Sequence, residues 1–199
     1  MKEAAHSVAV FIMAEIQSMN RISLVLTGAV AAIAFAFSAL AVAASTSEIN
    51  ARVEAALSRF YAQDPNHREL ANKASAMLVF PSVTKAGAGV GGEYGEGALQ
   101  VHGKTVAYYK LTGASAGATL GVARRSEVLL FMTDAALEKF MNSKDWTVGV
   151  DAGVAVVKGA GAQYDSETLR KPVVAFVFGE KGLIADVSLE GAKVTKLPQ

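Results

Sequence analysis

Apolar and polar positions follow two different periodicities along this chain of 199 residues. Between residues 45 and 77, apolar side chains recur at three- and four-residue spacing, which predicts amphipathic helices. The apolar face of the first predicted helix consists of Ile49, Val53, Ala56, Leu57 and Phe60. Both helices are expected to pack on a sheet, and contact with a membrane surface is the alternative for the first.

The ends of these helices are marked by capping signals. Ser45 and Glu48 have the spacing of a capping box, which predicts that the first helix begins there. Asp64-Pro65-Asn66 is expected to end it, because proline interrupts a helical pattern. Asn66 with Glu69 predicts the cap of the second helix.

From Met77 onward the pattern is typical of strands. The predicted strand segments are MLVF up to Pro81, ALQV, TVAYYKL, EVLLFM, TVGVDAGVAVV, PVVAFVFG, LIADVSLEG and AKVTKL. Turns are predicted at His102-Gly103, at Arg124-Arg125-Ser126 and at residues 179–182. Thr133 or Asp134 is expected to cap one inserted short helix, whose apolar face is Leu137, Phe140 and Met141. Eight or nine short strands without alternating helices favour antiparallel pairing.

Glycines recur at two-residue spacing in one part of this predicted sheet. Gly87, Gly89, Gly91, Gly95 and Gly97 share one phase of an extended strand, so one face there lacks side chains. Strong curvature, close approach by another element, or the floor of a groove would each explain such a face. We therefore predict an α+β fold: a strongly curved, Gly-rich antiparallel sheet or barrel-like core, covered by N-terminal helices and one inserted short helix.

The N-terminal region predicts export. Residues Ile22 to Ala44 carry no charge, follow Met19-Asn20-Arg21, and contain a small-residue cleavage pattern at residues 41–43, which is typical of a signal peptide. A retained transmembrane anchor is the alternative, because 23 uncharged residues could span a bilayer. We expect Met19 to be the natural start. The predicted organisation is an extension plus signal peptide over residues 1–43 and a single domain over 44–199, periplasmic or secreted and peripheral to the membrane.

Composition excludes several functions. The chain has no cysteine, so disulfides, thiolate zinc sites and a cysteine nucleophile are excluded. The formal net charge is +1 and no basic arm is present, so a nucleic-acid partner is not indicated.

Three catalytic or phosphate-binding motifs occur in the wrong context. Residues 87–92 satisfy G-x-G-x-x-G, but no helix follows to hold a pyrophosphate. Residues 103–105 resemble the end of a P-loop but lack its first glycine. Residues 113–117 satisfy G-x-S-x-G, but no histidine follows as a base for Ser115.

The remaining polar residues form no convincing catalytic set. His67 and His102 are expected to face solvent and cannot make a zinc site alone. Glu93 and Glu96 lie three apart and should alternate faces on a strand. Asp151 is expected to be a buried, hydrogen-bonded structural acid. The sequence therefore predicts no enzyme, cofactor or metal.

Several blocks in order carry a family resemblance. LVFPSVTKAGAGVGGEYGEGALQV, TVAYYKLTGASAGATLG, SEVLLFMT, W-x-V-G-V-D-A-G-V-A and SLEGAKVTKL make the chain similar to the SYLF domain family, over about Leu70 to Leu197. That family is related to the Ysc84-type actin-binding domain, and this chain resembles its exported bacterial branch. The resemblance implies a phospholipid-binding module, with phosphoinositides as ligands and actin as a partner for some eukaryotic members.

The resulting hypothesis is a non-enzymatic protein of the bacterial envelope that binds anionic phospholipid headgroups at a membrane surface. Candidate headgroup contacts are Lys85, Lys73, Lys104, Arg124 and Arg125, and candidate interfacial aromatic residues are Tyr94 and Trp146. An exported protein would not meet actin. The alternative is a structural protein that binds another envelope protein or associates with its own copies, through exposed strand edges.

Overall fold

The computed structural model describes residues 45–151, 153–159, 166–182 and 191–198. These residues all belong to one compact unit, Ala44–Gln199. The predicted signal peptide and start site, and most of the predicted strand LIADVSLEG, lie outside the described residues.

Helix α2 (Thr46–Gln63) has the predicted cap and the predicted buried face. The Ser45 hydroxyl oxygen accepts a hydrogen bond from the Glu48 backbone N–H at 3.3 Å. The five apolar residues named above for this helix are its buried residues. None of the helices in the described part of the chain is long and apolar enough to cross a membrane.

Helix α3 (Asn66–Lys73) differs from the prediction in two respects. Its N-cap is Pro65 rather than Asn66, and the Asp64 carboxylate accepts from the Asn66 backbone N–H at 2.8 Å. His67 does not face solvent, because its ring stacks on Phe60 with 4.2 Å between centroids, and its Nδ1 lies 2.8 Å from the Phe60 carbonyl oxygen. The apolar phase of the helix therefore includes the histidine.

Two long strands dominate the sheet, where many short ones were expected. Strand β1 (Ala76–Val101) and strand β2 (Lys104–Phe131) form an antiparallel hairpin around the predicted His102-Gly103 turn. The strand end predicted at Pro81 and the turn predicted at Arg124-Arg125-Ser126 are bulges inside these strands. A bulge interrupts the regular pairing without ending the strand, which is why these sites resemble turns in the sequence.

The described residues after β2 add four short strands to the hairpin and two short helices. These are α4 (Asp134–Asn142), β3 (Asp145–Thr147), β4 (Val154–Lys158), α5 (Ser166–Leu169), β5 (Val173–Gly182) and β6 (Lys193–Lys196). The strand order is β3-β6-β2-β5-β4, with β1 on β2. Strands β4 and β5 pair in parallel, so the prediction of purely antiparallel pairing is wrong for this edge.

The alternating segment TVGVDAGVAVV is not one strand. A turn separates β3 from β4, because the Asp151 carboxylate accepts from the Thr147 backbone N–H at 2.6 Å. The Asp151 backbone carbonyl in turn accepts from the Lys139 side chain. Asp151 is half-buried and acts as a structural, hydrogen-bonded acid.

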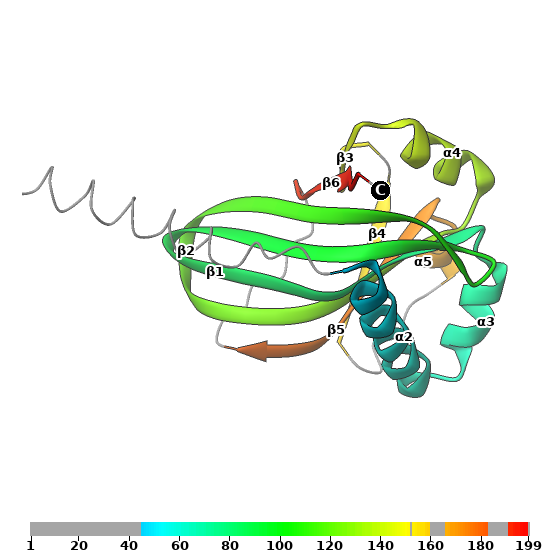
Figure 1. Cartoon of the computed structure of the whole chain (residues 1–199), viewed down its shortest axis with the longest axis horizontal. Helices are drawn as coiled ribbons and strands as arrows, with labels where there is room; N and C mark the ends of the chain where they lie inside the picture. The colour runs from blue at the N-terminus through cyan, green and yellow to red at the C-terminus, as the bar shows by residue number, and fades with distance from the viewer. Residues whose placement is uncertain (1–44, 152, 160–165, 183–190, 199) are drawn as a thin grey trace, which may run out of the picture. The chain divides into compact units, whose positions relative to one another are not determined.

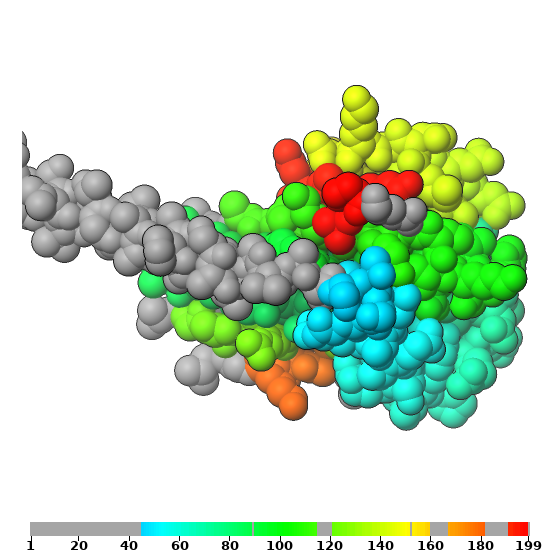
Figure 2. Space-filling view, viewed as in Figure 1, coloured from blue at the N-terminus to red at the C-terminus, as the bar shows by residue number. Residues whose placement is uncertain are grey.

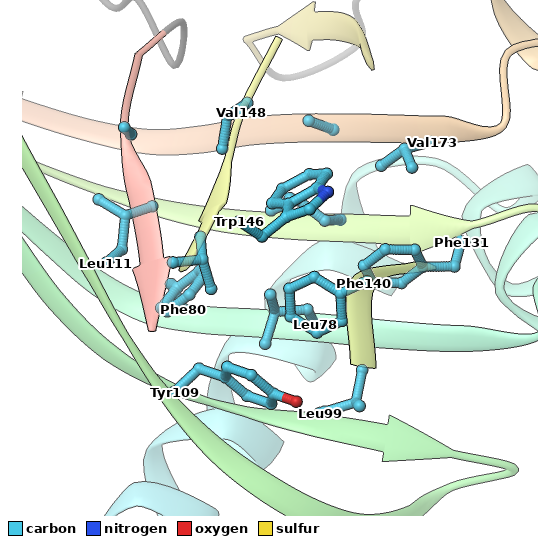
Figure 3. Packing of buried hydrophobic residues seen from close by; sticks show 14 of the residues in the cluster. Leu78, Phe80, Leu99, Tyr109, Leu111, Phe131, Phe140, Trp146, Val148 and Val173 are labelled. Carbon is cyan, nitrogen blue, oxygen red and sulfur yellow. The ribbon is translucent and has the colours of Figure 1, made fainter. Parts of the chain in front are cut away.

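Both faces of the sheet are buried, each by its own apolar cluster. The concave cluster includes Leu78, Leu129 and Ala175, and α4 and β3 close it with Phe140 and Trp146. Figure 3 shows Trp146 near Phe131 and Phe140 in this core. The convex cluster lies beneath α2 and α3, and β1, β2 and β5 therefore contribute alternate residues to the two clusters.

The hairpin folds back on itself (Figure 1). Residues 76–88 pair with 120–131 to make a first arm, and residues 90–101 pair with 104–116 to make a second arm. The arms meet at a bend where β2 contributes residues 117–119 between ladder pairs and β1 contributes only residue 89. The structure is thus the predicted α+β fold with a strongly curved, glycine-rich sheet.

Two of the patterned glycines allow the two arms to touch. A Cβ on Gly97 would collide with the Val79 carbonyl oxygen and lie 2.7 Å from the Phe80 ring. A Cβ on Gly95 would lie 3.0 Å from the Ser82 carbonyl oxygen. The side-chain-free face at these positions therefore serves the close approach of β1 to its own beginning and is covered by it.

This contact predicts a strong effect of one methyl group. Gly97→Ala should lower the free energy of unfolding by about 3 kcal/mol, because the clash is with backbone and overpacking a tight contact costs this order of energy. Gly153→Ala is the matched control, because a Cβ there meets nothing within 4 Å. Chemical denaturation should show a lower free energy of unfolding for Gly97→Ala but not for Gly153→Ala. Equal denaturation midpoints for the two variants would contradict the close contact between the two arms.

Candidate functional site

A cluster of charged side chains is buried between the two arms of the hairpin. The Arg125 Nη2 group lies 2.7 Å from Glu93 Oε2, and the Arg125 Nε group lies 2.6 Å from Glu127 Oε1. Arg125 is 4% exposed and Glu127 is fully buried. Since Arg125 and Glu127 belong to the first arm and Glu93 to the second, the guanidinium joins the two arms.

Local irregularities in both neighbouring strands lie beside Arg125, opposite Ser126 in β1 and opposite Arg125 itself in β5. On one side, residues 81–82 of β1 lack ladder partners between the pairs of Phe80 and Val83. On the other side, residues 179–180 of β5 lack them between the pairs of Phe178 and Lys181, and Gly179 has a positive φ of 67°. The strand β5 thus passes through the predicted 179–182 turn with a bulge.

The small residues Gly113 and Ser126 lie beside the buried charged cluster. A Cβ on Gly113, the ladder partner of Glu93, would lie 2.6 Å from Glu93 Oε1. On the convex face, the Ser126 hydroxyl donates to the Pro81 carbonyl oxygen at 2.9 Å, and Arg59 of α2 donates to the same hydroxyl at 3.3 Å. These contacts hold the irregular part of β2 in place from both faces.

Burial and the neighbouring charges together shift the pKa values of this cluster. Burial raises the pKa of Glu127 to about 7, although Arg125 opposes that shift. The Oε2 atom of Glu127 makes no hydrogen bond to any residue that the structure describes. Burial lowers the pKa of Arg125, but Glu127 and Glu93 outweigh it and raise the pKa overall, so the guanidinium stays charged.

The structure separates the five cations predicted to contact headgroups. Lys85 and Arg125 are buried, at 5% and 4% exposure, and do not present their charge on an open surface. Lys73, Lys104 and Arg124 are exposed. Lys73 ends α3 and is paired with Glu69 at 2.7 Å, whereas Lys104 begins β2 beside the hairpin turn. The five residues therefore do not form one patch.

Arg124 has a cationic neighbour that the sequence did not reveal. Its ladder partner on β5 is Lys181, which is also exposed. Among the described residues, neither Arg124 nor Lys181 makes an ion pair. The only signal for Lys181 would have been the register of β5 against β2, which the bulge at residues 179–180 conceals.

The two predicted interfacial aromatic residues have different surroundings. Trp146 is 1% exposed and packs against Phe140 at 5.3 Å between ring centroids, so it belongs to the concave core. Tyr94 is half-buried, and its hydroxyl donates to Glu96 Oε1 at 2.6 Å. Burial, with that hydrogen bond, raises the pKa of Tyr94 to about 12.

Comparison with protein families supports the sequence resemblance. Residues 112–198 match the Ysc84 family, described as "Las17-binding protein actin regulator". The match confirms the resemblance to the SYLF (Ysc84) family over the region from the second arm of β2 to β6.

One curated relative is similar over a longer region. The chain is 29% identical over 157 residues to "Beta cell expansion factor A" of Aeromonas veronii, which covers 73% of this chain and 54% of the relative. The chain thus spans about half the length of this relative.

Two adjacent arginines give a direct test of the buried cluster. Arg125→Met should lower the free energy of unfolding by about 3 to 5 kcal/mol, because it leaves two carboxylates buried without their cation. Arg124→Met, the control, should change it by less than about 0.5 kcal/mol, because its side chain is exposed. Similar denaturation midpoints for the two variants would contradict the structural role of Arg125.

The raised pKa of Glu127 predicts how stability varies with pH. The folded-state pKa of about 7 lies above the ordinary value of 4.5, so the folded protein binds a proton more readily than the unfolded chain between these values. This contribution is fully present below pH 4.5 and is lost as pH rises through 7, with a magnitude on the order of 3 kcal/mol.

Glu127→Gln removes the titrating group and keeps its shape. Melting temperatures measured at pH 5 and pH 8 should fall more for the unmodified protein than for Glu127→Gln, because all other titrating groups are shared. Parallel pH profiles would show that Glu127 titrates normally in the folded protein.

Proposed function

We propose that this protein binds anionic phospholipid headgroups at a membrane surface and is not an enzyme. The observation that carries the proposal is the exposed pair Arg124 and Lys181, which are ladder partners without an ion-pairing acid among the described residues. Two adjacent unpaired cations fit a phosphate-bearing surface. The resemblance to the SYLF family, whose members include phospholipid-binding modules, supports the same function.

The expected binding is weak and sensitive to salt. Each lysine or arginine near an anionic surface contributes about 1 kcal/mol, and this contribution decreases beyond a Debye length of about 8 Å at physiological salt. Lys104 is a further exposed cation, whereas the charge of Lys73 is already compensated by Glu69. The pair at Arg124 and Lys181 is therefore the best candidate for a localised contact.

The buried cluster does not support a catalytic alternative. A pKa raised by burial is typical of general acids, and Glu127 has that property. A general acid must also come within hydrogen-bond reach of the reacting group. The carboxylate of Glu127 is fully buried and bound to Arg125, so we assign it to the stability of the bend.

A structural protein that associates with its own copies is the second candidate. Positions 86–92 of β1 and 113–122 of β2 pair with each other, and no other described strand pairs with either edge of this ribbon. Open strand edges can pair with another chain. An exported location, which remains a prediction, would separate this protein from actin.

Vesicle co-sedimentation tests the proposed function. Binding to vesicles of phosphatidylglycerol and phosphatidylcholine at low salt should exceed binding to phosphatidylcholine alone. Arg124→Ala combined with Lys181→Ala should weaken it about 30-fold, since two contributions of about 1 kcal/mol are lost. No binding to the anionic vesicles by the unmodified protein would contradict the function.

The matched control removes the same charge elsewhere. Lys73→Ala combined with Lys104→Ala also lowers the net charge by two, at positions outside the Arg124–Lys181 pair. It should weaken binding much less. Equal weakening by the two double variants would show that binding depends on overall charge and not on this pair.

A further inference from the structure

The bend of the hairpin has an unusual composition for an exposed part of a protein. None of residues 86–92 and 113–122, which we call the apolar bend, is charged, and most are glycine or alanine. The side chains of Val90 and Val122 are 67% and 55% exposed. Val90 and Val122 of the apolar bend therefore present apolar side chains to solvent.

Among the described residues, no third strand pairs with either edge of the apolar bend. The pairing of β2 with β5 stops at Ala123, and its pairing with β6 stops at Thr112. In Figure 2 the green strands extend past the cyan helices toward the left end. A two-stranded ribbon without further support is marginally stable in water, so an apolar contact surface would favour it.

Charged residues border the apolar bend on the first arm. Arg124 follows Val122 by two residues and therefore lies on the same face of β2, and Lys181 is next to it on β5. Glu93, the acid that borders the bend on the second arm, is neutralised by Arg125. The exposed side of the border thus includes two cations directly behind the apolar surface.

We propose that the apolar bend inserts into the interfacial region of an anionic bilayer, with Arg124 and Lys181 at the level of the headgroups. This inference rests on the proposed function and specifies which part of the protein enters the membrane. Apolar surface bordered by cations is the arrangement that binds anionic membrane interfaces. Protein partners are a poorer fit, because protein interfaces rely on aromatic and arginine anchors, which the apolar bend lacks.

The reach of the bend is longer than the headgroup layer is thick, so the bend must lie tilted in the membrane surface to keep this shallow position. Residue 89, at the tip of the bend, is five residues beyond the ladder pair of Thr84 and Arg124. At about 3.3 Å per residue, the tip therefore lies at most about 16 Å beyond this pair. The headgroup layer of one leaflet is about 5 to 8 Å thick. Strand edges that no described strand pairs need hydrogen-bond partners, which water and headgroups supply at the interface and hydrocarbon does not. The bend should therefore stop at the interface.

The absence of cysteine makes a site-specific test possible on the full chain. Val90→Cys and Val122→Cys place single labelling sites in the apolar bend. Val106→Cys is the matched control, because Val106 is 45% exposed on β2 near the hairpin turn. Each variant is labelled with an environment-sensitive nitrobenzoxadiazole dye and mixed with vesicles of phosphatidylglycerol and phosphatidylcholine.

Insertion predicts a blue shift and an increase in emission of about twofold or more at positions 90 and 122, with quenching by nitroxide-labelled acyl chains. The label at position 106 should remain unchanged. Co-sedimentation of the same samples separates the two proposals. Vesicle binding with all three labels unchanged overturns the insertion of the bend and leaves the proposed function intact, whereas no vesicle binding overturns both.

A further outcome concerns a second copy of the chain. If the emission of labels 90 and 122 changes with protein concentration in the absence of vesicles, another molecule covers the bend, and the insertion is wrong. Val90→Asp combined with Val122→Asp adds an independent measurement: it should reduce vesicle binding at least tenfold while Val106→Asp does not. Unchanged binding of the double variant would also overturn the proposal.

Discussion

The ion pair between Arg125 and Glu93 is the interaction on which the shape of this protein depends. Strand β1 has 26 residues and would extend about 86 Å if it were straight. Folding the hairpin back places its two arms face to face, and the ion pair joins them at 2.7 Å where the concave core ends. Glu127 completes the pairing of the guanidinium. Losing one partner would leave an uncompensated charge in a largely buried site, so the arrangement is strongly coupled to the bend.

Glycines make the same folding-back possible for a different reason. At Gly95 and Gly97 the second arm approaches residues 79–83 so closely that a Cβ would meet backbone atoms. The same phase of glycines that suggests a ligand groove or phosphate loop in the sequence is, at these two positions, an adaptation to self-contact. Gly113 has a third role, because its missing side chain leaves space for the Glu93 carboxylate.

Local signals in the sequence predicted the local structure well. The Ser45 cap, the buried face of α2 and the His102-Gly103 turn depend on neighbouring residues, and all three are confirmed. The curved α+β architecture also followed from glycine spacing. The lengths of β1 and β2 did not, because Pro81 and Arg124-Arg125 have the composition of turns while their bulges depend on strands distant in the sequence.

The candidate site shows the same limit more sharply. Arg124 and Arg125 are adjacent and chemically identical, yet one is exposed and the other is 4% exposed, because successive residues of a strand face opposite sides. Sequence pattern could not assign the faces at a bulge, and it could not pair Arg124 with Lys181 or Arg125 with Glu93. His67 was misassigned for a related reason, since its burial depends on the Phe60 ring beneath it.

A single framework connects the interior of the hairpin to its proposed surface function. The buried cluster and the glycine contact fix the bend, and the bend carries the uncharged surface with Arg124 and Lys181 behind it. The membrane contact that we propose therefore depends on residues that would not touch lipid. Substitutions in the buried cluster should therefore mainly lower stability, whereas substitutions at Arg124 and Lys181 should mainly weaken binding.

A double-mutant cycle between Arg125 and Glu93 tests the role of this ion pair most directly. The free energies of unfolding of Arg125→Met, Glu93→Gln and the double variant, compared with the unmodified protein, give the coupling between the two side chains. We predict a coupling between about 1 and 3 kcal/mol, as expected for groups in direct contact. A coupling near zero would show that the two arms are held together without this ion pair.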